Sequence, residues 1–174
     1  MKTLVIHPLD DTTDFLEPIY SKIPNKTVIR AGVSRLQLIN QIFLNDRILM
    51  MGHGTEDGLL SVGKFLDTGF YVVDQTLVSL LKAKGNSVFI WCHADKFVSK
   101  FNLSGFCTGM FISELGEAVY YGYTNISQAE INESNNTFSL LVSQSILCNS
   151  KTIFKKVRAG YRKLATSSHI AEFN

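Results

Sequence analysis

Two short apolar runs constrain the fold of this chain more than any other feature, and each ends in a reactive side chain. Residues 46–51 run into Gly52-His53-Gly54, and residues 86–91 run into Cys92-His93-Ala94-Asp95. Short apolar runs bounded by turn residues are typical of strands that are buried on both faces of a parallel sheet. We therefore expect two buried parallel strands, one followed by an imidazole and the other by a thiol.

The order of the expected elements indicates the fold class. Strands are predicted over residues 2–6, 26–30, 48–51 and 87–91, with helices after Asp14, Ser34 and Asp74 and over residues 94–101. This alternation is typical of an α/β fold with a mostly parallel central sheet, and right-handed crossovers then place helices on both of its faces. A chain of 174 residues is expected to form a single domain spanning 1–174.

The remaining segments give less regular patterns. The Gly-rich and aromatic segment 58–73 is expected to hold a small hairpin or a flap. Two further strands are predicted over residues 109–112 and 118–123, followed by helices over 127–148 and 152–164. Asp14, Ser34 and Asp74 are the predicted N-caps of their helices, because a short polar side chain accepts a hydrogen bond from the first turn.

Composition and charge exclude several classes of function. Apolar residues make up 45% of the chain and charged residues 18%, which fits a compact globule. A net charge of +2 gives no indication of nucleic-acid binding. No apolar stretch reaches the roughly 18 residues that a membrane helix needs, so no membrane partner is expected. The N-terminal residues lack a signal-peptide core, and a cytoplasmic location is the expectation.

One of the three cysteines is a candidate nucleophile, and the other two are expected to be structural. The chain has three, Cys92, Cys107 and Cys148, and an odd count without regular spacing argues against a disulfide framework. The absence of C-x-x-C and H-x₃-H pairs argues against a structural zinc site, and neither a metal nor a cofactor is expected. Cys107 and Cys148 have apolar neighbours and are predicted to be small buried hydrophobic residues.

His53 and Cys92 suggest nucleophilic catalysis. Ligands of open α/β sheets bind outside the carboxyl ends of the strands, so two neighbouring strands would deliver both side chains to one edge. A nearby imidazole raises the thiolate fraction of a cysteine, and His53 would take the thiol proton and later return one to the leaving group. The amides of Gly54 and Cys92 are predicted to form an oxyanion hole. This pattern predicts a Cys–His hydrolase, with a peptidase as the first hypothesis.

These motifs resemble those of a known family. Gly52-His53-Gly54 and Cys92-His93-Ala94 look like the caspase-like cysteine peptidases of clan CD, nearest to the metacaspase pattern Gly-His-Gly plus Cys-His-Ser-Gly. The segments 137–142 and 152–158 are similar to the end of a bacterial CHAT domain, a branch of the same superfamily. The resemblance implies a three-layer caspase-like fold, a catalytic dyad of His53 and Cys92, and a protein or peptide substrate cleaved through a thioester acyl-enzyme.

The chain also departs from the family pattern. Caspase-type motifs place glycine shortly after the cysteine, where this chain has Ala94 and Asp95. The acid that metacaspases carry two residues before the cysteine is Ile90 here, so a preference for basic substrates cannot be carried over from that position. Acidic groups for contact with substrate would instead be Asp95, or Asp10 and Asp11 in the loop after the first strand. These acids disfavour a caspase-like preference for aspartate.

Structural explanations exist for each of these residues taken alone. His53 would then be a turn residue and Cys92 a core residue, but their joint placement favours a dyad. Two other interpretations stay open: an inactive caspase-like interaction or regulatory module, and a flavodoxin-like protein that binds a small molecule. The chain has no G-x-G-x-x-G, P-loop or G-x-S-x-G motif, which weakens a nucleotide-binding or serine-hydrolase interpretation.

Four further residues have a preferred structural interpretation. Glu56 or Asp57 would orient His53 as a third member of the site, although an exposed turn is favoured for both. The sole tryptophan, Trp91, is expected to pack in the core. His169, near the C-terminus, is expected to be solvated.

Overall fold

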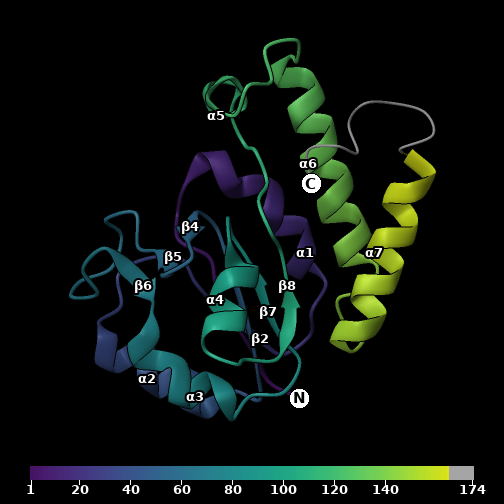
Figure 1. Cartoon of the computed structure of the whole chain (residues 1–174). Helices are drawn as coiled ribbons and strands as arrows, with labels where there is room; N and C mark the ends of the chain where they lie inside the picture. The colour runs from purple at the N-terminus through teal and green to yellow at the C-terminus, as the bar shows by residue number, and fades with distance from the viewer. Residues whose placement is uncertain (165–174) are drawn as a thin grey trace. The chain divides into compact units, whose positions relative to one another are not determined.

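A five-stranded, all-parallel sheet forms the centre of the fold (Figure 1). The computed structural model describes residues 1–164. Across the sheet the strands are β2 (Lys26–Ile29), β1 (Thr3–Ile6), β3 (Arg47–Met51), β7 (Ser87–Ile90) and β8 (Gly105–Cys107). This confirms the predicted α/β class with a parallel central sheet and is consistent with a three-layer α/β fold.

Helices connect and follow these strands. They are η1 (Asp11–Leu16), α1 (Glu17–Ser21), α2 (Arg35–Leu44), η2 (Gln75–Leu77), α3 (Val78–Lys82), α4 (Ala94–Lys100), α5 (Leu115–Tyr120), α6 (Gln128–Ser143) and α7 (Ser150–Leu164). None of the helices within residues 1–164 has the length and apolar character needed to cross a bilayer.

The chain divides into two compact units. The first unit comprises residues 1–11 and 23–109, and the second comprises residues 12–22 together with the chain from Met110 onward. The expectation of one domain over 1–174 stays a prediction, and both the end of that range and His169 lie outside the described residues.

The sheet of the first unit is buried on both faces, as its continuous apolar strands predict. On one face Ile48, Phe89 and Trp91 pack in a cluster with buried residues of α2, α3 and α4. On the other face Leu49 and Ile90 have no exposed surface either. Packing on both faces holds the strands in place, and this fixes the position in space of the residues that directly follow each strand.

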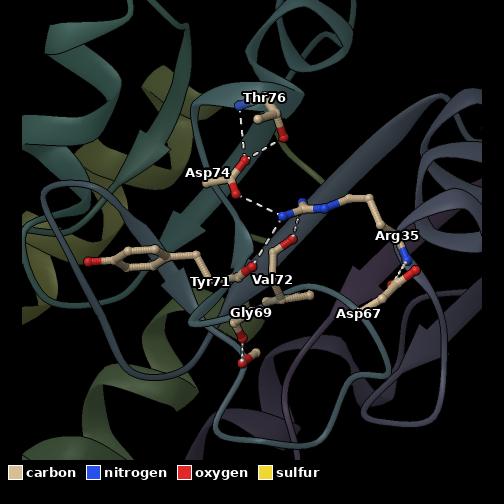
Figure 2. Close-up of polar contacts among 8 residues, drawn as sticks. Arg35, Asp67, Gly69, Tyr71, Val72, Asp74 and Thr76 are labelled. Atoms are coloured by element: carbon tan, nitrogen blue, oxygen red, sulfur yellow. Dashed lines mark hydrogen bonds and ion pairs between the residues drawn. The ribbon is translucent and has the colours of Figure 1, made fainter.

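Residues between β3 and α3 build a second, smaller sheet. The segment 58–73, expected to hold a hairpin or flap, forms the antiparallel strands β5 (Gly58–Leu60) and β6 (Tyr71–Val73), and β5 also pairs with β4 (Gly54–Thr55), which precedes that segment. Arg35, in the first turn of α2, donates hydrogen bonds to the carbonyls of Val72 at 3.0 Å and Tyr71 at 3.3 Å (Figure 2). It also pairs with the carboxylate of Asp74 at 2.7 Å. These contacts fasten β6 to the start of α2.

Two of the three predicted N-caps are confirmed. Ser34 forms a capping box with Gln37 at the start of α2, and Asp74 accepts a hydrogen bond from the Thr76 amide at the start of η2. The prediction for Asp14 is wrong, because Asp14 lies inside η1 and α1 begins only at Glu17. Pro18 occupies the first turn of α1, where its fixed φ is already helical.

The strand predicted over residues 109–112 is wrong. Ile112 is buried, but its carbonyl accepts a hydrogen bond from the Asn135 side chain of α6 at 2.9 Å rather than from a neighbouring strand. A polar side chain from a distant helix thus satisfies this backbone group, and no ladder forms.

The strand predicted over residues 118–123 is also wrong, because Ala118 to Tyr120 belong to α5. Glu117 accepts hydrogen bonds from the Ser113 amide at 2.8 Å and from its hydroxyl at 3.0 Å, which satisfies polar groups at the start of this helix. Val119 and Tyr120 are 53% and 83% exposed, whereas Ala118 is buried in a small cluster with Ile112 and Ile131, so only one face of this apolar run enters a core.

The sequence did not reveal β8, the short strand that pairs with β7. Gly105 approaches β7 so closely that a Cβ atom there would lie 2.3 Å from the carbonyl oxygen of Ser87. A side chain at this position would therefore push the two strands apart. In the second unit, α6 and α7 are confirmed close to their predicted ranges, and α7 buries Ile153 and Val157.

Candidate functional site

His53 and Cys92 follow neighbouring strands at the same edge of the central sheet. Met51 of β3 lies opposite Ile90 of β7, and the Gly52 amide donates to the Ile90 carbonyl at 3.0 Å. His53 comes two residues after Met51, and Cys92 comes two residues after Ile90, so they take equivalent positions beyond the paired strands. Both residues are half-buried. The register brings the predicted base and nucleophile to one edge.

Cys92 lies in a tight turn that leads from β7 into α4. The next residue, His93, has φ of 64° and ψ of 25°, a left-handed conformation that is uncommon for a residue other than glycine. Its amide donates to the Gly109 carbonyl at 2.7 Å, and the Asp95 amide donates to the Thr108 carbonyl at 2.9 Å. Backbone hydrogen bonds thus hold the turn that carries the thiol, and strain of this kind often occurs at functional sites.

His53 lies at the start of the β4–β5 hairpin. Gly54 pairs with Leu59, and the His53 carbonyl accepts a hydrogen bond from the Leu60 amide at 2.9 Å. The bond from Leu60 makes His53 and Leu60 a hydrogen-bonded pair of the antiparallel ladder. Because hydrogen-bonded and non-hydrogen-bonded pairs alternate, the next pair, Gly54 and Leu59, is not hydrogen-bonded, and the Gly54 amide points away from β5. An amide in this orientation is free of the hairpin ladder, as the predicted oxyanion role requires.

Trp91 links the two loops. Its ring is fully buried, which confirms the core prediction, and its Nε1–H donates to the Thr55 carbonyl at 2.9 Å. The ring also packs against Gly54, where a Cβ atom would lie 2.1 Å from the Trp91 Cδ1 atom. The residue before Cys92 is thus bonded to the hairpin that follows His53, and glycine is needed at position 54 for this close packing.

Two ion pairs connect the same hairpin to α4. Asp57 pairs with Lys100 at 2.8 Å, and Glu56 pairs with Lys96 at 3.8 Å. The hydrogen bond and the charge of Asp57 raise the pKa of Lys100 above its usual value. Glu56 and Asp57 are exposed residues of the turn, which confirms the favoured interpretation of both.

The three acids predicted to contact substrate have different surroundings. Asp10 is half-buried, and its Oδ2 atom lies 4.0 Å from the His53 Nε2 atom. Asp11 is exposed at the start of η1. Asp95 is exposed in the first turn of α4, and after burial its charge is the second cause that raises the pKa of Cys107. The structure therefore brings Asp10 to His53, and contact of any of the three with substrate stays a prediction.

The prediction that Cys107 and Cys148 are buried hydrophobic residues is wrong, because both are half-buried. In β8 the alternation of side chains buries Phe106 and leaves Cys107 at the margin of the core. Burial, and secondarily the charge of Asp95, raise the pKa of the Cys107 thiol. None of these three cysteines forms a disulfide bond.

The described residues contain no cluster suited to a metal ion. Within residues 1–164 there is no group of three or more His, Cys, Asp or Glu side chains that could hold one. A hollow of about 700 Å³ lies at the amino ends of β1 and β2, lined by Lys2, Asn25 and Lys26 among others. It is at the end of these strands opposite to their carboxyl ends, and it does not include His53 or Cys92.

Comparison with known proteins gives no relative: no family model matches the chain, and neither does any curated protein or solved structure. One fold supports many activities, so function has to follow from the residues of the site. Those residues are an imidazole, a thiol and a carboxylate at the carboxyl edge of a parallel sheet.

Proposed function

We propose that this chain is a cysteine endopeptidase of the caspase-like type, with Cys92 as nucleophile and His53 as general acid and base. The observation that supports this most is the register of β3 and β7, which sets the imidazole and the thiol after neighbouring parallel strands. The resemblance of Gly52-His53-Gly54 and Cys92-His93-Ala94 to clan CD motifs supports the same assignment.

The reaction requires two acyl transfers. The Cys92 thiol gives its proton to His53, and the thiolate attacks the carbonyl carbon of the scissile peptide bond. The C–N bond then breaks as His53 protonates the leaving amine, and a thioester remains on Cys92. A water molecule, deprotonated by His53, attacks the thioester, and the departing sulfur takes the proton back.

The amides of Gly54 and Cys92 would bind the oxyanion of each tetrahedral intermediate. The hairpin ladder directs the Gly54 amide away from β5, which leaves it to face a ligand. Donors of this kind contribute roughly 3 kcal/mol each to transition-state binding in other acyl-transfer enzymes.

The substrate is a protein or peptide. Asp10 and Asp11 follow β1 at the edge where His53 follows β3, so an acidic substrate side chain is disfavoured there. The chemistry needs no cofactor. Three cysteines that form no disulfide, Cys92, Cys107 and Cys148, suit a reducing compartment, and we propose a cytoplasmic location.

Thiol alkylation tests the dyad without knowledge of the substrate. Iodoacetamide at about pH 7 should modify Cys92 at least tenfold faster than Cys107, because thiolate is the reactive form and the raised pKa of Cys107 disfavours it. Peptide-level mass spectrometry would give both rates in one sample. His53→Ala should slow Cys92 and leave Cys107 unchanged.

Hydrolysis of a peptide library provides the second readout. Cys92→Ala and His53→Ala should abolish cleavage, whereas Cys107→Ala should retain it. If Cys92 reacts no faster than Cys107 and Cys92→Ala leaves hydrolysis unchanged, the catalytic assignment is wrong and an inactive interaction module becomes the better description.

A second candidate function rests on strand order. The order β2-β1-β3-β7-β8 is that of flavodoxin-like folds, which bind ligands where the order reverses, here between β1 and β3. The loop after β1 contains Pro8, Asp10 and Asp11 but no glycine, so it offers negative charge where a phosphate would need amide donors. Flavin or nucleotide absorbance in the purified protein would favour this candidate.

A further inference from the structure

Asp10 and His53 belong to loops that follow paired strands. Ile6 of β1 lies opposite Met50 of β3, so the loops after these strands leave the sheet side by side. The carboxylate of Asp10 and the imidazole of His53 then meet at 4.0 Å, with side chains 27% and 22% exposed. Partial burial strengthens a charge interaction relative to the same pair in water.

The geometry also distinguishes the two ring nitrogens of His53. The Asp10 carboxylate lies on the Nε2 side of the ring. A carboxylate that closes to hydrogen-bond distance of Nε2 would hold the proton there and leave the lone pair on Nδ1. Nδ1 would then be the atom that takes the proton from the Cys92 thiol.

Other charged and titratable groups surround this edge of the sheet. Glu56 and Asp57 direct their carboxylates to Lys96 and Lys100 of α4. Asp11 is exposed. His7 has no exposed surface directly after β1, and His93 adopts a left-handed conformation beyond Cys92. The acids of the β4–β5 turn are thus engaged with α4, whereas Asp10 faces the imidazole.

We infer that Asp10 is a positioning residue that orients His53 and stabilises the imidazolium formed when Cys92 gives up its proton. This inference rests on the proposed function. A carboxylate next to a catalytic histidine keeps the ring in one tautomer and favours its protonated form without itself taking the proton. The pair is longer than a hydrogen bond in the free protein, and such contacts tighten when substrate binds.

The test is the pH dependence of Cys92 alkylation by iodoacetamide between about pH 5 and 9, since a purely structural role would not move it. Asp10→Asn keeps the size of the side chain and removes its charge. It should lower the Cys92 rate at about pH 6 by about tenfold and move the profile to higher pH, because the imidazolium that supports the thiolate loses its counter-charge. Glu56→Gln is the matched control, because its exposed carboxylate pairs with Lys96 rather than with His53, and it should follow the wild type.

Asp10→Glu provides the rescue variant. It restores the charge and should recover most of the rate at about pH 6, which would separate loss of charge from loss of folding. With a cleavable peptide of uncharged side chains, Asp10→Asn should lower kcat and leave KM unchanged.

The outcomes separate this inference from the proposed function. If wild type and His53→Ala give the same Cys92 profile, there is no dyad and the proposed function fails. If His53→Ala changes the profile but Asp10→Asn does not, the dyad stands and the role of Asp10 is wrong. Equal effects of Asp10→Asn and Glu56→Gln would also overturn it, since an exposed acid paired with Lys96 would then act as well as Asp10.

Discussion

The loop that carries His53 and the turn that carries Cys92 are held in different ways. The thiol turn is fixed by backbone hydrogen bonds, including those from the His93 and Asp95 amides. The imidazole loop also has backbone hydrogen bonds, to Ile90 and Leu60, but side chains join its hairpin to the neighbouring elements, through Trp91 and Lys100. The position of the imidazole is therefore more sensitive to substitution than the position of the thiol.

The reason lies in how the chain leaves each strand. After β7 it enters α4 at once, and the helix packs on the sheet from which it came. After β3 it enters the separate β4–β5–β6 sheet, which Arg35 fastens to α2 at its far strand (Figure 2). The position of the His53 loop thus depends on the side-chain contacts that join the β4–β5–β6 sheet to Trp91, to α4 and to α2.

The largest effect on stability is expected from Gly54→Ala, which changes the packing of the imidazole loop against Trp91. The new Cβ atom would lie 2.1 Å from the Trp91 ring and 2.7 Å from the Gly58 carbonyl oxygen. Since the ring is buried and cannot move aside, we expect a loss of about 3 kcal/mol in the free energy of unfolding. Urea denaturation measures it.

Gly85→Ala is the control for this change, because no atom lies within 4 Å of a Cβ atom built there. It should change the free energy of unfolding by less than about 0.5 kcal/mol. Equal stabilities of the two variants would show that the hairpin does not hold the imidazole loop in the way described.

An intermediate effect of opposite sign is expected from His93→Gly in the thiol turn. Glycine adopts the left-handed conformation of His93 at little cost, so stability should rise by about 1 kcal/mol. The alkylation rate of Cys92 should stay at the wild-type value, because backbone bonds hold the turn. Asn102→Gly, at another left-handed position, is the control for the stability gain. A fall in both stability and Cys92 rate would mean that the His93 side chain supports the site.

The smallest effect is expected from Asp57→Asn, which removes an exposed ion pair of the hairpin. The pKa of Lys100 should return toward its usual value, and an NMR titration of its side chain would measure this. Because the pKa of Lys100 is raised in the folded protein, its pair with Asp57 contributes to folding stability in full below the pKa that Lys100 has in the unfolded chain. This contribution to stability is lost as the pH rises through the pKa of Lys100 in the folded state.

At neutral pH the stability of Asp57→Asn should be indistinguishable from wild type, since solvent screens exposed pairs. Glu56→Gln, which removes the neighbouring pair, is the control and should leave the pKa of Lys100 nearly unchanged, because the charge of Glu56 is only a minor cause of its shift. A marked loss of stability in Asp57→Asn would make this ion pair, rather than the packing of Trp91, the main support of the imidazole loop.

Prediction from the sequence succeeded where structure depends on neighbouring residues. The apolar runs before His53 and Cys92 form β3 and β7, and Ser34 and Asp74 cap their helices. The run at residues 109–112 has the same apolar character, yet Asn135 binds the Ile112 carbonyl and no strand forms. Nothing near residue 112 in the chain indicates that distant partner.

The site shows the same limit. A thiol and an imidazole after two buried strands are visible in the sequence, but the approach of Asp10 to His53 depends on β1 and β3 being neighbours. The acids that follow His53 directly, Glu56 and Asp57, were the local candidates for a third member, and both turn to α4 instead.

By itself the sequence determined the α/β class and which side chains follow its buried strands, because apolar periodicity and capping act between residues close in the chain. Only the tertiary structure decided which strands are neighbours, and hence that Asp10 faces His53 and that Trp91 joins the loops of His53 and Cys92. Strand order and close packing arise between segments distant in the chain, where no local pattern records the partner.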